Sequence, residues 1–184
     1  MIPAAVVVVA SLWVLLMSRL RLATLGLLAQ FAAANALSAG LAPRVEVALL
    51  GAAGLAAAVI LYLAARDNAF GEAPGWRVWP AIGIALVATT LAFRVFASTE
   101  VDLYLQLAAF WLVSVGLGIL LAARTPVRVV LGALLMFSGT QLALRFEPGP
   151  HLGLTVAFSW VEVLLTLVGA FLIINRKALD DDVS

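Results

Sequence analysis

Long uncharged apolar stretches dominate this sequence and restrict the kind of fold it can adopt. Seven of them, separated by charged residues or by Pro and Gly, lie at residues 3–18, 22–41, 45–65, 78–96, 103–122, 127–146 and 152–174. A transmembrane helix needs about 20 mostly apolar residues. A transmembrane β-barrel would need alternating strands of about 9–11 residues, and these Leu- and Ala-rich runs do not alternate. The sequence therefore predicts an all-α polytopic membrane protein with seven transmembrane helices.

The composition excludes several classes of protein. The chain is 65% apolar and 11% charged, with a mean hydropathy of +1.14, whereas soluble domains are about 45–50% apolar and about 25% charged. A net charge of +1 without a basic run argues against nucleic-acid binding. The absence of Cys and the single histidine, His151, exclude thiolate metal sites, iron–sulfur ligands and paired haem ligands. We therefore expect no cofactor and no metal site.

The basic residues predict the orientation of the chain. Eight of the 11 fall on one side of the predicted membrane: Arg19, Arg21, Arg66, Arg77, Arg124, Arg128, Arg176 and Lys177. The other three, Arg44, Arg94 and Arg145, fall on the opposite side. Because positive residues concentrate in cytoplasmic loops, the C-terminus is predicted in the cytoplasm and the N-terminus outside, in a multi-pass protein of the inner (plasma) membrane.

The chain is expected to form a single membrane domain with a weak internal repeat. A shift of 106 residues lays Gly26 on Gly132 and Asn35 on Gln141. The repeat predicts a 3+1+3 parallel arrangement, with a first three-helix repeat at 1–66, a linking helix at 67–101 and a second three-helix repeat at 102–184.

Glu162 is the one acidic residue predicted near the centre of a transmembrane helix. The other acids fall at predicted loops, helix ends or termini. An ionised acid at the bilayer centre costs about 3 kcal/mol on insertion scales, so Glu162 should face protein or water, and desolvation favours its neutral form. Two interpretations stay open: a proton-relay carboxylate, or a protonated Glu that only bonds a neighbouring helix.

Polar residues near Glu162 form two predicted stripes. Helical spacing places Thr155, Ser159, Glu162, Thr166 and Gly169 on one face of helix 152–174, and Ser138, Gln141 and Arg145 on one face of helix 127–146. At a rise of about 1.5 Å per residue, Gln141 is expected near the depth of Ser159, and Ser138 near that of Glu162. The facing stripes predict a polar row from the outer surface to the membrane centre, and ordinary Ser/Thr packing is the alternative. The proton-relay candidates are Glu162, Ser159, Gln141, Ser138 and Arg145.

Short motifs carry a family resemblance. Met1-Ile2-Pro3, the basic pair Arg19 and Arg21, and Gly26-Leu27 resemble the small K-type membrane subunit of the proton-pumping NADH:quinone oxidoreductase, respiratory complex I. Residues 61–68 (LYLAARDN) and 176–181 (RKALDD) are similar to segments of the E-type membrane subunit of group 4 hydrogenase and formate hydrogenlyase complexes, which looks like a doubled K-type unit.

The resemblance implies a non-catalytic membrane subunit of an ion-translocating oxidoreductase complex. Its partners would be antiporter-like and other membrane subunits of the redox complex, together with membrane lipid. Glu162 matches a Glu of helix three that the K-type family places in a midplane chain of polar groups. The family's second Glu is replaced by Leu28 and Leu134, so the subunit is expected to supply one relay point, or to act as a spacer that holds antiporter-like subunits.

Two other functions stay open. A 3+1+3 parallel repeat also builds autonomous small transporters of the SWEET type, which carry a substrate site between their halves. A membrane scaffold or assembly protein, in which Glu162 is only structural, is the other alternative.

Overall fold

The structure, a computed structural model, describes residues 1–66, 75–147 and 149–181. Within these ranges every regular element is helical, which confirms the predicted all-α class. The elements are α1 (Ile2–Leu16), α2 (Leu20–Ser38), α3 (Arg44–Ala64), α4 (Val78–Phe96), α5 (Leu103–Ala122), α6 (Pro126–Ala143), the 3₁₀ turn η1 (Leu144–Phe146) and α7 (Leu152–Asp181).

Six of these helices, α2 to α7, are long and apolar enough to cross a membrane, as their lengths and compositions show. The first predicted stretch forms the shorter α1, with 15 residues. A residue far along the sequence caps the C-terminal end of α1. The Arg128 guanidinium donates hydrogen bonds to the carbonyl oxygens of Leu15 and Met17 at 2.9 and 2.8 Å. The long apolar helices are compatible with a membrane protein.

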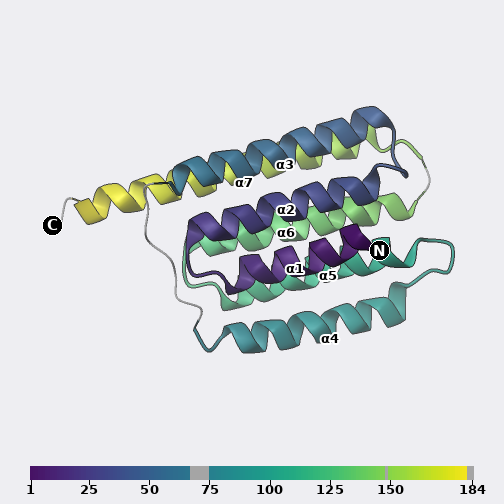
Figure 1. Ribbon diagram of the computed structural model, residues 1–184, viewed down its shortest axis with the longest axis horizontal. Coiled ribbons are helices and arrows are strands. Elements are labelled where there is room, and N and C mark those ends of the chain that lie inside the picture. The colour runs from purple at the N-terminus through teal and green to yellow at the C-terminus, as the bar shows by residue number, and fades with distance from the viewer. Residues whose placement is uncertain (67–74, 148, 182–184) are drawn as a thin grey trace.

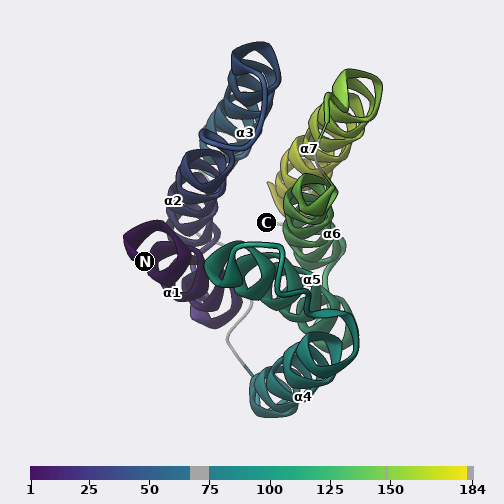
Figure 2. The same ribbon diagram turned by 90° about the vertical axis from the view of Figure 1, so that its right-hand side faces the viewer.

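The helices form two layers that face each other (Figures 1 and 2). One layer contains α1, α2 and α3 in chain order, and the other contains α5, α6 and α7. Each helix of the first layer packs against its counterpart in the second, α1 on α5, α2 on α6 and α3 on α7, and α4 lies outside against α5. Facing helices begin at the same end of the bundle. We call the end where α3 and α7 begin the outer end and the opposite end the inner end, after the predicted orientation.

Glycines let α5 and α6 pack with their backbones close together. A Cβ added at Gly116 of α5 would lie 2.6 Å from the carbonyl oxygen of Gly132 on α6, and one added at Gly139 would lie 2.9 Å from the carbonyl oxygen of Ala109. Small residues at such crossings permit the close van der Waals packing that holds helices together in lipid. This crossing fixes the position of α6, which carries Ser138 and Gln141.

Candidate functional site

Polar side chains from both layers meet inside the bundle. Four of them form what we call the polar row: Gln30 of α2, Ser138 and Gln141 of α6, and Glu162 of α7. All four are buried, with exposed fractions between 0 and 7%. Ser138 and Gln141 are three residues apart on one helix and therefore share a face, which links the two hydrogen-bonded pairs of the row.

Glu162 has one hydrogen-bonded carboxyl oxygen and one without a partner. The side-chain amide of Gln141 donates to Oε2 at 3.3 Å, whereas no group in the described part of the chain bonds Oε1. The helix around it is regular, and its backbone carbonyl oxygen accepts a hydrogen bond from Thr166 Oγ1 at 2.8 Å. Glu162 is therefore held by one long contact and keeps a carboxyl oxygen available.

The other end of the row crosses to the first layer. The Gln30 amide donates to Ser138 Oγ at 2.7 Å. Sequence reasoning placed Ser138 at the depth of Glu162 on the basis of α6 and α7 alone, and did not identify Gln30 as its partner. In the structure the long Gln141 side chain bonds Glu162, and Ser138 bonds α2 instead.

A small polar cavity lies beside the row. It encloses about 20 Å³, and Asn35, Ser38, Ser138 and Gln141 contribute its polar lining. A cavity of this size has room for about one water molecule. The Oδ1 atom of Asn35 and the Oε1 atom of Gln30 are both buried without a hydrogen-bond partner in the described ranges. Asn35 lines the cavity, so a water molecule there could donate to its Oδ1 atom.

Ser159 and Thr155 share the buried stripe of α7 with Glu162 but have different surroundings. Ser159 is half-buried, and its hydroxyl has no partner among the described residues. Thr155 lies nearer the outer end and belongs to a second polar group. The two stripes thus meet at two described contacts, Gln141 with Glu162 and Arg145 with Thr155.

Arg145 belongs to this second group, which we call the outer cluster. Its guanidinium forms a buried ion pair with Glu46 of α3 and donates to Thr155 Oγ1 at 3.1 Å. The backbone N–H of His151 donates to Glu46 Oε1 at 2.9 Å. The cluster therefore joins the first turn of α3 to η1 and to the start of α7.

Sequence reasoning missed Glu46 as a site residue, because it only grouped this acid with those at the outer side of the predicted membrane. Glu46 is 1% exposed and directly compensates Arg145. One available signal was that both residues fall on the same predicted side of the membrane, near helix ends, with opposite charges. Of the five relay candidates, Arg145 thus lies in an ion pair, and Gln141 and Glu162 contact each other.

No group of three or more His, Cys, Asp or Glu side chains suited to a metal ion occurs in the described ranges. The chain shows no match to known protein families, to curated proteins or to solved structures.

Proposed function

We propose that this chain is an integral membrane subunit of an ion-translocating redox complex of the complex I-like or group 4 hydrogenase-like kind, in which Glu162 relays protons. The observation that carries the proposal is the burial of Glu162 within α7, beside a hydrogen-bonded row that reaches α2. An acid inside a membrane span is costly, and such residues mark ion and proton pathways by default.

The chemistry of the polar row suits proton movement. A carboxylate binds and releases a proton, and Ser hydroxyls and Gln amides can both donate and accept hydrogen bonds. The Oε1 atom of Glu162 can accept a proton while Oε2 keeps its contact with Gln141. A water molecule in the neighbouring cavity would itself be a mobile proton carrier, in contact with Ser138 and Gln141. The row therefore supports lateral transfer between the two layers.

The exterior of the bundle suits a subunit surrounded by lipid and partner helices. Large apolar side chains are exposed on α3, α4 and α7, including Leu55, Val87 and Phe171. We assign α1 as a short seventh span, and we assign the two facing layers as the repeats of a 3+1+3 arrangement. The parallel pairing of counterpart helices supports this assignment.

Purification of the tagged chain from its native membrane in a mild detergent tests the proposal. We expect antiporter-like subunits and a hydrogenase- or dehydrogenase-like subunit to co-purify in stoichiometric amounts, identified by mass spectrometry. Recovery of the chain alone, or only as a homo-oligomer, would overturn the subunit assignment.

The facing layers also favour a second candidate, an autonomous small transporter of the SWEET type. In such a carrier the substrate binds between the two three-helix halves. Substrate uptake by proteoliposomes that contain the purified chain alone distinguishes this candidate, because a subunit of a redox complex would show none.

A further inference from the structure

The outward face of the first layer carries two apolar grooves that share one wall. The α1/α2 groove encloses about 520 Å³ and is lined by residues that include Val9 and Trp13 of α1 and Leu25 and Ala29 of α2. The α2/α3 groove encloses about 200 Å³, between Leu25 and Leu28 of α2 and residues of α3. Leu25 is 47% exposed and stands as a ridge between the two grooves. The face therefore offers two narrow parallel grooves.

The walls of the grooves are held in place by local contacts. A Cβ added at Gly26 would lie 2.8 Å from Cδ1 of Trp13, so the indole packs directly on the α2 backbone. Trp13 Nε1 donates to the carbonyl oxygen of Leu22 at 3.0 Å. The Trp13 side chain thus forms a fixed inner-end wall of the α1/α2 groove.

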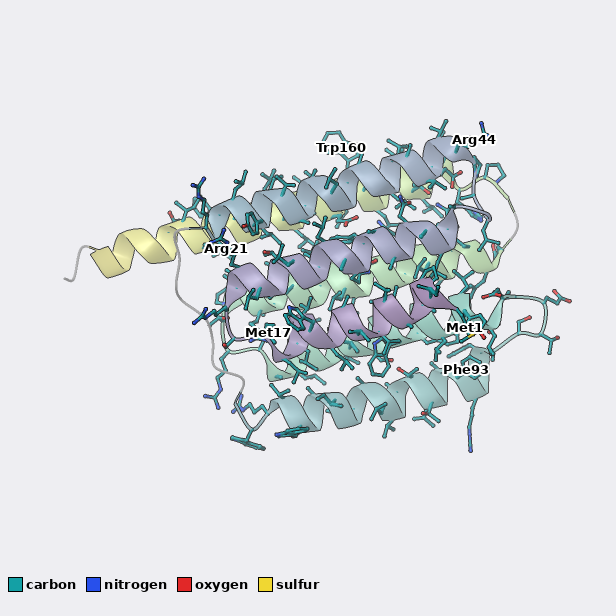
Figure 3. All side chains as sticks on the ribbon, in the orientation of Figure 1. Met1, Met17, Arg21, Arg44, Phe93 and Trp160 are labelled. Atoms are coloured by element: carbon teal, nitrogen blue, oxygen red, sulfur yellow. The ribbon has the colours of Figure 1, made fainter. Side chains whose placement is uncertain are left out.

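A positive charge lies at the inner end of the α2/α3 groove, close to the Leu25 ridge that the two grooves share. Arg21 precedes Leu25 by four residues on α2, so it lies on the same helix face one turn nearer the inner end (Figure 3). The guanidinium donates to Tyr62 Oη through Nε at 3.0 Å and Nη2 at 2.6 Å, and its Cζ lies 5.0 Å from the centroid of the Tyr62 ring. Tyr62 itself lines the α2/α3 groove. Arg21 is nevertheless exposed, and Arg19 adds a second exposed charge nearby.

We propose that this face binds one two-chain anionic phospholipid, with its phosphate at Arg21 and one acyl chain in each groove. Arg recognises phosphate through fixed, charge-assisted hydrogen bonds. The Leu25 ridge separates the two grooves, so each groove can hold one acyl chain. A single-chain amphiphile would fill one groove and leave the other uncovered.

Thermal unfolding of the purified chain in detergent micelles tests the site. We expect phosphatidylglycerol to raise the Tm more than phosphatidylcholine at equal concentration, and more than lysophosphatidylglycerol, which has one chain. Arg21→Gln should weaken phosphatidylglycerol binding about fivefold, as loss of one basic contact with an anionic lipid implies. Arg94→Gln, an exposed arginine at the outer end, is the matched control and should leave the binding unchanged.

A second variant separates the site from general effects on folding. Leu25→Trp keeps Arg21 and fills the mouths of both grooves, so it should abolish the preference for two-chain lipid while the protein stays folded. Equal stabilisation by all three lipids, or an unchanged phosphatidylglycerol response in Arg21→Gln, would overturn the proposal. A photoreactive residue at position 25 that cross-links to another protein subunit, rather than to lipid, would also overturn it.

Discussion

The protein buries two glutamates to the same extent but gives them different surroundings. Glu46 and Glu162 are each 1% exposed. Glu46 is compensated by the Arg145 guanidinium, the Thr155 hydroxyl and the backbone N–H of His151. Glu162 has one hydrogen bond, from Gln141, and one oxygen without a partner in the described residues. Equal burial therefore does not imply an equal role, since the first acid is compensated by a charge and the second keeps one carboxyl oxygen without a partner among the described residues.

Removing the compensating charge of Glu46 should have the largest effect on stability. Arg145→Met leaves the buried carboxylate without its partner, and breaking a buried ion pair in this way costs about 3–5 kcal/mol. We expect a loss of that size in the free energy of unfolding, measured by denaturant titration in detergent micelles. Arg94→Met, on the exposed outer end of α4, is the control and should change the free energy by less than about 0.5 kcal/mol. A small loss for Arg145→Met would mean that the buried ion pair contributes little to the stability of the protein.

Replacing both partners should restore much of that stability. In Glu46→Gln/Arg145→Met the buried charge is gone, and apolar or neutral replacements of buried ion pairs are often tolerated. We expect the double variant to lose less than half of what Arg145→Met loses, in the same unfolding assay. A double variant that is no more stable than the single variant would show that the cost comes from packing rather than from charge.

The polar row should contribute less to stability than the outer cluster. Ser138→Val removes the acceptor of the Gln30 amide, and an unsatisfied buried donor costs about 1–3 kcal/mol. The matched control is Thr90→Val, since the Thr90 hydroxyl is exposed and bonds the Leu86 carbonyl oxygen of its own helix. We expect the control to stay within about 0.5 kcal/mol of the unchanged protein. Equal losses of stability in the two variants would show that the hydrogen bond between Gln30 and Ser138 contributes no more than a hydrogen bond within one helix.

Glu162→Gln should have the smallest effect on stability and a large effect on function. The amide preserves the shape of the side chain and cannot carry a proton, so we expect a change of less than about 1 kcal/mol in the free energy of unfolding. In inverted membrane vesicles that contain the assembled complex, proton translocation measured by a pH-sensitive dye should fall at least about tenfold. That fall equals about 1.4 kcal/mol in the barrier to transfer.

Glu100→Gln provides the matched control for Glu162→Gln, because Glu100 is an exposed acid between α4 and α5. It should leave translocation unchanged. Normal pumping by Glu162→Gln in a correctly assembled complex would remove the relay role and leave Glu162 as a structural residue.

The positions of the helices follow closely from the sequence. Each apolar stretch ends at charged residues, which are costly to place in lipid, or at Pro and Gly, which interrupt a helix. The predicted stretches 78–96 and 103–122 coincide with α4 and α5. The neighbours of each helix do not follow in the same way, since hydropathy shows that a face is buried without showing what covers it. The pairing of Glu46 with Arg145 requires the start of α3 to lie beside η1, and the pairing of Gln30 with Ser138 requires α2 to lie against α6. These contacts join residues about 100 positions apart in sequence, and only the fold brings them together.

The parallel pairing of α3 with α7 has an electrostatic consequence for the outer end. Each helix macrodipole places the equivalent of about half a positive charge at its N-terminus. Antiparallel neighbours cancel this field, but α3 and α7 begin side by side, so their positive ends add at the same place. Glu46 lies in the first turn of α3 and accepts the N–H of His151 immediately before α7. One carboxylate thus lies at two positive helix ends as well as beside Arg145. The fields of both helices and the guanidinium charge together stabilise its ionised form inside the bundle.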